Sequence, residues 1–318
     1  MSREPATAGD DAPDAGAALH RCDRRGLPEP PRAASCWLSA GGETLQMHGK
    51  TILITGATDG VGRVVATALG KPGAKVLVHG RDATRAGEVV AGIRDAGGQA
   101  VFYAADFSSL AEVRALAAKV GKDHPRLDLL INNAGIGSRS GGGARRTSRD
   151  GHELRFAVNY LAGFVLTHLL LPCLRAGPRA RIVNVASAGQ ARIDFADVML
   201  MRGYDGGRAY GQSTLAQIMF TIDLAEALRG SSVTVNTLHP ATYMPTTMVR
   251  EAGVKPISTL AEGATAILKL ALAAELEGRS GLYFEGRREA RALAQAYDAS
   301  ARARLGALSR ALTGLPAR

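Results

Sequence analysis

The sequence predicts an α/β fold in which one doubly wound domain is built on a seven-stranded parallel sheet. From Lys50 onward, short β-rich apolar runs alternate with stretches of helical periodicity, which is the pattern of strands joined by helical crossovers. A glycine-rich turn follows the first apolar run and opens a helix. The alternation continues without an internal repeat, so residues 47–318 are expected to form a single domain.

The expected strands lie at residues 51–55, 75–79, 100–104, 127–131, 181–185, 233–238 and 281–284. Helical periodicity appears between them, for example over residues 111–120 and 215–228. The longest apolar patch, residues 164–171, is interrupted by Thr167 and His168 and is predicted to be a buried helix. A bilayer span needs about 20 apolar residues, so no membrane span is predicted.

The first 46 residues differ in composition from the rest of the chain. They are rich in Ala, Pro, Gly, Asp and Arg with almost no periodic hydrophobicity, which predicts a disordered extension over residues 1–46. The segment lacks the apolar region of a signal peptide, and Asp10, Asp11 and Asp14 are untypical of a transit peptide. A start of translation at Met47 is a further hypothesis. The expected location is cytoplasmic.

The charge and the cysteines argue against several classes of function. The net charge is +10, but the arginines are scattered and few aromatic residues lie beside them. A solvated surface that attracts an anionic cofactor is therefore favoured over nucleic-acid binding. The basic residues 145–149 are expected to form an exposed loop. Cys22, Cys36 and Cys173 lack metal-ligand spacing, which favours reduced thiols and no metal site.

The first strand ends in Thr55-Gly-Ala-Thr-Asp-Gly-Val-Gly62, and a helix follows. Glycines here let the backbone turn sharply and approach a pyrophosphate, while the free N–H groups of the next helix bind that anion. A glycine triplet alone also makes ordinary turns. The strand before it, the helix after it and the alternating pattern that follows together predict a dinucleotide site.

Five motifs in this order resemble the short-chain dehydrogenase/reductase family, whose members have a Rossmann fold. After the glycine turn come Asn132-Asn-Ala-Gly135 behind the fourth strand, then Asn159, Ser187 and Tyr210. The resemblance extends from about Gly49 to the C-terminus. It implies that Asn159, Ser187 and Tyr210 are catalytic. The cofactor contacts that it implies are at Gly56, Thr58, Asp59, Gly60, Val61, Gly62, Asp106, Phe107, Asn133, Ala134, Gly135, Tyr210 and Pro240.

Further features resemble the retinol-dehydrogenase-like branch of that family. The interval between Ser187 and Tyr210 is long and contains Asp194-Phe195-Ala196-Asp197. The strand at residues 282–284 and the C-terminal segment 308–315 are also similar to that branch. The resemblance implies hydride transfer between a nicotinamide cofactor and a small, apolar alcohol or carbonyl compound. It does not name the substrate.

The second strand should end beside the adenosine ribose, where the side chains determine which cofactor binds. An acid there binds the 2′-hydroxyl of NAD, whereas an arginine pairs with the 2′-phosphate of NADP. Here the segment reads His79-Gly80-Arg81-Asp82, and Arg63 is a second candidate cation. The other interpretation is that Arg81 is an ordinary charged residue and Asp82 a helix N-cap. NADP(H) is preferred over NAD(H).

The helix that carries Tyr210 departs from the family at one position. The family has Tyr-x-x-x-Lys, and this chain has Tyr210-Gly-Gln-Ser-Thr214. Tyrosine has a reference pKa of about 10, which the charge of the lysine lowers toward a useful range. Thr214 has no charge, and Arg208 is expected to point elsewhere. Two interpretations remain: a weakened NADP(H)-dependent oxidoreductase, or a non-catalytic NADP(H)-binding regulatory or scaffold protein.

The same helix has an apolar face with the spacing of a core-facing or subunit-facing helix. Its residues are Leu215, Ile218, Met219 and Ile222. The family resemblance implies a homodimer or homotetramer that packs through this helix.

Two expectations concern the loop after the sixth strand. Tyr243, Met244 and Met248 are expected either to line an apolar substrate pocket or to pack in the core. His239-Pro-Ala241 stands where the family usually has Pro-Gly. Alanine would be strained there if the turn required a positive φ.

Overall fold

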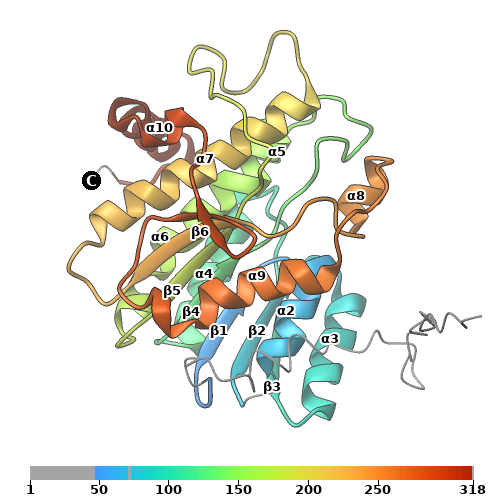
Figure 1. Cartoon of the computed structure of the whole chain (residues 1–318), viewed down its shortest axis with the longest axis vertical. Coiled ribbons are helices and arrows are strands. Elements are labelled where there is room, and N and C mark those ends of the chain that lie inside the picture. The colour runs from blue at the N-terminus through green and yellow to red at the C-terminus, as the bar shows by residue number, and fades with distance from the viewer. Residues whose placement is uncertain (1–46, 71–72, 317–318) are drawn as a thin grey trace, which may run out of the picture.

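The computed structural model describes residues 47–70 and 73–316, and one sheet of eight strands runs through its centre (Figure 1). The strand order is β3-β2-β1-β4-β5-β6-β7-β8. The strands are β1 (Thr51–Ile54), β2 (Lys75–Gly80), β3 (Gln99–Ala104), β4 (Leu129–Asn132), β5 (Arg181–Val185), β6 (Thr234–His239), β7 (Tyr283–Glu285) and β8 (Arg288–Ala290). Strands β1 to β7 pair in parallel, which confirms the predicted parallel sheet.

The eighth strand was not predicted. Strand β8 pairs antiparallel with β7, and Glu285 lies opposite Arg288 across a tight turn at Gly286, whose φ is 58°. A glycine adopts this backbone conformation without steric cost. The strand is only Arg288-Glu-Ala290, which is too short and too polar to have a recognisable alternation.

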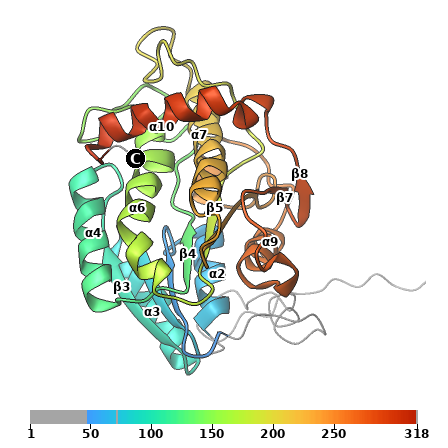
Figure 2. The ribbon, with the colours of Figure 1, turned by 90° about the vertical axis from the view of Figure 1, so that its left-hand side faces the viewer.

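Two layers of helices cover the two faces of the sheet. They are α2 (Gly60–Gly70), α3 (Ala83–Asp95), α4 (Leu110–Asp123), α5 (Leu154–Phe156), the π-helix η1 (Ala157–Leu161), α6 (Ala162–Arg175), α7 (Gly206–Ala227), α8 (Thr247–Glu251), α9 (Leu260–Leu272), the 3₁₀ turns η2 (Ala274–Leu276) and η3 (Ala294–Tyr297), and α10 (Ala299–Thr313). Figure 2 shows α4, α6 and α7 on one side and α2 and α9 on the other. Both faces are therefore buried, which explains why the strands read as continuous apolar runs.

Helix α6 contains the predicted buried segment and confirms it. Phe164, Val165 and Leu170 are among its buried residues, and the Phe164 ring lies 5.1 Å from that of Phe220 on α7. The continuous helical stretch Phe156–Arg175 is long and apolar enough to cross a membrane by length and composition. However, 67% of its most apolar window is buried inside the fold, as in the core helix of a globular domain.

Helix α10 lies across α6 and α7 (Figure 2). Ser309 and Tyr160 hydrogen-bond through their hydroxyls at 2.7 Å, and the nearly buried Arg302 forms ion pairs with Asp223 and Glu226 of α7 at 3.3 and 2.7 Å. On α7 itself, Leu215, Ile218 and Met219 have no exposed surface and Ile222 is partly buried. The apolar face of α7 thus packs largely within its own chain.

The predicted disordered extension lies outside the described residues, as do Cys22 and Cys36. Cys173 is buried and free.

Candidate active site

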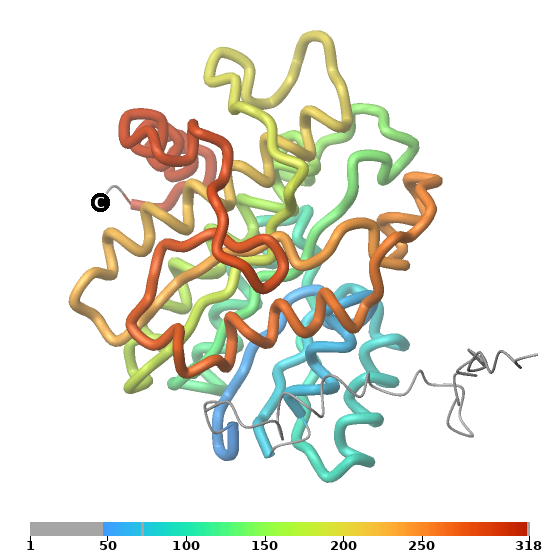
Figure 3. The backbone as a smooth tube through the Cα atoms, viewed as in Figure 1, coloured from blue at the N-terminus to red at the C-terminus, as the bar shows by residue number. Residues whose placement is uncertain are grey.

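The carboxyl ends of the parallel strands bring the predicted site residues to one edge of the sheet. The strand order reverses between β1 and β4, and in doubly wound sheets ligands bind at this switch point. The glycine turn follows β1, the asparagine motif ends β4, and the segment with Ser187 follows β5. In the backbone trace of Figure 3, the long segment before α7 arches above this edge of the sheet.

The glycine turn is shaped by close backbone contacts. Gly56 and Gly60 have φ values of 63° and 53°. A Cβ on Gly62 would overlap the carbonyl oxygen of Gly56 and the side-chain amide of Asn133. That amide donates to the carbonyls of Thr55 at 2.9 Å and Gly56 at 3.1 Å, so it holds the turn against the end of β4. The turn leads into the N-terminus of α2, and the positive end of the helix dipole there fits a pyrophosphate.

The other residues of the turn hold it against neighbouring elements. Thr58 packs against Gly80 of β2, and Val61 is buried in the core. The carboxylate of Asp59 accepts hydrogen bonds from the Gly60 amide at 2.7 Å and the Thr247 hydroxyl of α8 at 2.6 Å. Burial would raise the pKa of Asp59, but these hydrogen bonds and nearby arginines lower it. Helix α8 is therefore attached to the glycine turn.

The residues at the adenosine end are charged and mostly exposed. Arg81 is 69% exposed and lies 4.0 Å from Asp106 at the end of β3. Asp82 accepts a hydrogen bond from the Arg85 amide at 3.0 Å and so caps α3. It also pairs with the Arg85 side chain at 3.3 Å. The other candidate cation, Arg63, is paired with an acidic residue of α3 at 3.2 Å.

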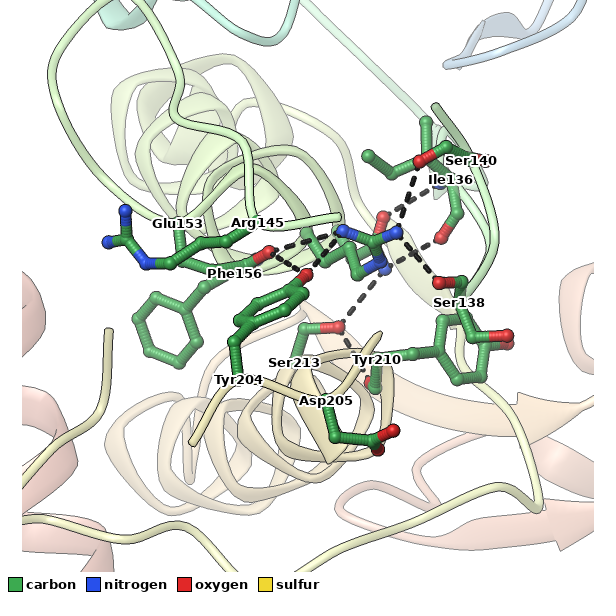
Figure 4. Close-up of polar contacts among 12 residues, drawn as sticks. Ile136, Ser138, Ser140, Arg145, Glu153, Phe156, Tyr204, Asp205, Tyr210 and Ser213 are labelled. Carbon is green, nitrogen blue, oxygen red and sulfur yellow. Dashed lines mark hydrogen bonds and ion pairs between the residues drawn. The ribbon is translucent and has the colours of Figure 1, made fainter. Parts of the chain in front are cut away.

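Asn159 lies in the π-helix η1, a type of helix that is common at functional sites. Its side-chain amide donates to the Ile136 carbonyl at 3.1 Å and the Ser213 hydroxyl at 3.0 Å, and its oxygen accepts from the Ile136 amide at 2.8 Å. Ser213 in turn donates to the Tyr210 carbonyl at 2.7 Å (Figure 4). Asn159 and Ser213 thus connect the segment after β4, which includes Gly135, to the first turns of α7.

Ser187 and Tyr210 converge beside Gly189. A Cβ built on Gly189 would lie 3.4 Å from the Tyr210 ring and 3.5 Å from the Ser187 hydroxyl. The Gly189 amide donates to that hydroxyl at 3.1 Å, which fixes the position of the Ser187 oxygen. Thr214 lies one helical turn after Tyr210 and is 4% exposed.

The surroundings of the Tyr210 phenol contain hydroxyls in place of a cation. Burial raises the pKa of Tyr210, and hydrogen bonds with the hydroxyls of Ser187 and Thr214 partly offset this. Within residues 47–70 and 73–316, no charged side chain contributes to the shift. Arg208 instead pairs with Asp194 at 2.9 Å, which confirms that it points away.

The loop after β6 has no strain at the position that differs from the family. Pro240 is buried, and positive φ occurs at Tyr243 (48°) but not at Ala241. The condition for a strained alanine is therefore not met. Met244 is buried against Gly263 in the core, whereas Met248 lies over Gly137 and Tyr243 is 49% exposed.

Comparison with known proteins places this arrangement in a family. The profile of the short chain dehydrogenases matches residues 50–256. The chain belongs to the short-chain dehydrogenase family. This short-chain dehydrogenase is 37% identical to retinol dehydrogenase 14 of Mus musculus over 302 residues, which cover 86% of this chain and 89% of the relative. It is 37% identical to polyprenol dehydrogenase of Mus musculus over 286 residues, 84% of each chain.

A solved structure supports the fold of this short-chain dehydrogenase. An uncharacterised protein of Mycobacterium paratuberculosis superposes with a TM-score of 0.72 and 30% identity, over 86% of this chain and 98% of that one. The comparisons confirm the retinol-dehydrogenase-like branch of the family. The chain is accordingly an oxidoreductase of alcohols and carbonyls that uses a nicotinamide cofactor.

The role of His79 in this short-chain dehydrogenase was not predicted from the sequence. Its Nδ1 accepts from the Gly56 amide at 3.3 Å, so Nε2 carries the proton toward the Ala105 carbonyl at 3.2 Å. The ring stacks on Phe107 with centroids 4.3 Å apart. Burial, more than any charge, lowers the pKa of His79 to about 4. A polar residue in an otherwise apolar strand next to the glycine turn was the available signal.

Proposed function

We propose that this chain is an NADP(H)-dependent oxidoreductase that interconverts an apolar alcohol and its carbonyl compound, with Tyr210 as the proton donor and acceptor. The observation that carries the proposal is the convergence of Ser187 and Tyr210 beside Gly189. Both lie at the same edge of the sheet as the glycine turn. Neither residue alone indicates chemistry, but the pair beside a cradle for a dinucleotide does.

Each residue has a defined task in this proposal. The bound cofactor supplies the hydride for the carbonyl carbon, or accepts it in the reverse direction. Ser187 donates a hydrogen bond from its hydroxyl to the substrate oxygen. In reduction, Tyr210 gives its phenolic proton to that oxygen, and in oxidation the Tyr210 phenolate takes the proton back. Asn159 and Ser213 hold the first turns of α7, which carries the phenol.

The protonation state of the Tyr210 phenol favours reduction at neutral pH. Because the pKa of Tyr210 is raised, its phenol is protonated near pH 7, which is the form that reduction needs. Oxidation needs the phenolate, and each unit of pKa costs about 1.4 kcal/mol of driving force. We therefore infer a reductase whose oxidative reaction becomes fast only at alkaline pH.

Two features support NADP(H) over NAD(H). Arg81 is largely exposed and only loosely paired, so its guanidinium is available for a 2′-phosphate. Asp82, the acid that follows it, is used as the cap of α3 and as a partner of Arg85, and so is not free for a ribose hydroxyl.

The relatives support an apolar substrate. Two of them are named as dehydrogenases of retinol and of polyprenol. In this chain, Met248 of α8 lies over Gly137 and adds an apolar side chain beside the segment that follows β4. We therefore propose a long-chain or isoprenoid aldehyde or ketone as the substrate class.

A second candidate is a non-catalytic NADP(H)-binding regulatory or scaffold protein. The observation that favours it is Thr214, because no cation among the described residues contributes to the pKa of the phenol. The glycine turn and Arg81 serve this role equally well.

The test is NADPH consumption with a panel of retinoid, isoprenoid and straight-chain aldehydes and ketones. The natural chain, Thr214→Lys and Tyr210→Phe are compared at equal concentration. Turnover by the natural chain that is lost in Tyr210→Phe supports the reductase. Turnover by Thr214→Lys alone, with tight NADPH binding by the natural chain, supports the non-catalytic protein. If neither the natural chain nor Thr214→Lys turns over any substrate, the result counts against an oxidoreductase of this substrate class.

A further inference from the structure

A fully buried arginine links two segments that border the candidate site. The Arg155 side chain has no exposed surface, and its partner Glu153 is 1% exposed. The guanidinium donates to the carbonyls of Gly137 at 3.0 Å, Ser138 at 2.7 Å and Ser140 at 3.1 Å. All three carbonyls belong to residues 137–140, which follow the asparagine motif of β4. Figure 4 draws Glu153, Ser138 and Ser140 of this cluster in one view with Tyr210 and Ser213.

The same guanidinium reaches the segment that precedes α7. It donates to the Tyr204 hydroxyl at 2.5 Å and to the Glu153 carboxylate at 3.4 Å. The Tyr204 hydroxyl donates to the same Glu153 oxygen at 3.0 Å. Burial, followed by the charge of Glu153, raises the pKa of Tyr204 to about 12, so this donor keeps its proton at every ordinary pH.

Arg155 has no donor left for a ligand. An arginine has five N–H groups, and here each one has its own partner: the carbonyls of residues 137, 138 and 140, Glu153 and Tyr204. Buried charges are retained where they are fully hydrogen-bonded, and this one is. Arg155 therefore acts on the reaction only through the segments that it holds.

The first of these effects is on the start of the catalytic helix. Tyr204 directly precedes Asp205, whose carboxylate accepts from the Arg208 amide at 2.7 Å and so caps α7. A Cβ on Gly206 would overlap the Ser138 carbonyl oxygen, so the first turn of α7 touches the 137–140 segment directly. Tyr210 lies one turn further along the same helix.

The second effect is on α8. The Ser140 hydroxyl donates to Glu251 of α8 at 2.8 Å and accepts from the Gly137 amide at 3.0 Å. Met248 of α8 contacts Gly137 closely. The 137–140 segment is thus the shared support of α8 and of the turn that carries Tyr210.

We propose that Arg155 is a positioning residue that sets Tyr210 and helix α8 in one fixed relation by holding residues 137–140 against Tyr204. The effect on turnover rests on the proposed function, whereas the effect on α8 does not. Charge alone does not explain the cluster, because a lysine at this position has three donors on one atom and cannot reach three separate carbonyls, a carboxylate and a hydroxyl.

The test uses the full chain with Tyr204→Phe, Arg155→Lys and Arg155→Met, and Arg302→Met as the matched control. Arg302 of α10 is the matched control because it is also nearly buried and ion-paired. Its partners, Asp223 and Glu226, lie near the C-terminal end of α7, far from Tyr210. Amide hydrogen exchange of residues 206–210 and 247–251 is followed in all variants. NADPH binding, kcat and KM are measured alongside.

Faster exchange in both segments is expected for the Tyr204 and Arg155 variants and not for Arg302→Met. We expect kcat to fall about 100-fold in Arg155→Met and about 5-fold in Tyr204→Phe, with NADPH affinity within about twofold, because a small misplacement of a reacting group is costly. Arg155→Lys should not restore kcat.

Unchanged exchange at residues 247–251, or the same pattern in Arg302→Met, would overturn the proposal. Unchanged kcat in a folded Arg155 variant would do so too. Tyr204→Phe decides the outcome if the Arg155 variants do not fold. If the natural chain has no turnover, the proposed function fails on its own and the exchange result still decides the role of Arg155.

Discussion

The two halves of the carboxyl edge of the sheet are built in different ways. The cofactor half includes the glycine turn after β1 and the asparagine motif at the end of β4. Its geometry depends on close backbone contacts that only glycine allows, as at Gly62, where a Cβ would overlap the turn itself. In the catalytic half, after β5 and β6, the geometry comes from side chains such as Ser187, Tyr210 and Thr214. The first half is fixed by steric exclusion, and the second by the placement of charge and protons.

The same difference can be seen at Thr214 and Ala241, the two positions where the sequence differs from the pattern that the family resemblance implies. Thr214 is 4% exposed within an uninterrupted α7, and Ala241 has no positive φ. Thr214 hydrogen-bonds with the phenol of Tyr210, and the backbone at Ala241 does not require a glycine. A comparable change at Gly62 would move the turn, because the atoms that it meets are a backbone carbonyl and a side-chain amide that is already hydrogen-bonded.

The largest effect that separates the halves is expected from Tyr210→Phe. Removal of the phenolic hydroxyl takes away the proton donor, so kcat for NADPH-dependent reduction should fall about 10³-fold. NADPH affinity, measured by fluorescence titration, should stay within about twofold because the glycine turn is untouched. A variant that keeps more than a tenth of the natural kcat would show that another group supplies the proton.

The second largest effect lies in the cofactor half and depends on pH. His79 has a folded-state pKa of about 4, below its usual value of 6.5. Its contribution to stability is therefore complete above pH 6.5 and is lost as the pH falls toward 4. The shift corresponds to about 3 kcal/mol in the free energy of unfolding.

Urea denaturation between pH 7 and pH 4.5 measures this loss. His79→Asn keeps an acceptor for the Gly56 amide but does not titrate, so its free energy of unfolding should fall less steeply with acid. His124 and His239 also have lowered pKa values, so they contribute to the pH dependence of both chains. The effect of His79 is therefore measured as the difference in the free energy of unfolding between the natural chain and His79→Asn. Parallel curves would show that folding does not lower the pKa of His79.

A third effect, in the catalytic half, is expected from Thr214→Lys. A cation beside the phenol lowers the pKa of Tyr210, so the pH at which alcohol oxidation reaches its plateau should fall by at least about one unit. That change corresponds to about a tenfold faster oxidation at neutral pH. Thr214→Met is the control for length without charge. Equal pH profiles for the lysine and methionine variants would contradict an electrostatic role.

The features that could be predicted from the sequence are those that depend on local patterns of residues. The seven parallel strands and the glycine turn were predicted because they depend on local patterns, namely apolar runs and glycine spacing. Strand β8 was missed because three polar residues pair only through the turn at Gly286. The predicted helix that carries Tyr210 is confirmed as α7, which starts at Gly206 behind the cap of Asp205.

Arg155 and His79 were missed for a different physical reason. Their partners are distant in the sequence: Arg155 binds Ser138 and Tyr204, 17 and 49 residues away, and His79 binds Gly56 and Ala105, 23 and 26 residues away. A charged or polar residue gives no periodic signal that it will be buried, because only its satisfied partners make burial tolerable. The predicted N-cap at Asp82 is confirmed because its partner lies only three residues away.

The smallest effect is expected at Arg81, on the exposed rim of the cofactor half. Arg81→Gln removes a cation that is 69% exposed, and an exposed charge is partly screened by solvent. The ratio of NADPH to NADH affinity should therefore fall only about tenfold, and the fall should shrink as salt is raised. Arg63→Gln is the matched control because Arg63 is already paired within the chain, so it should change the ratio less than about twofold. If the two variants exchange these results, Arg63 binds the 2′-phosphate, and the adenosine end of the site is organised by α2 instead of by the end of β2.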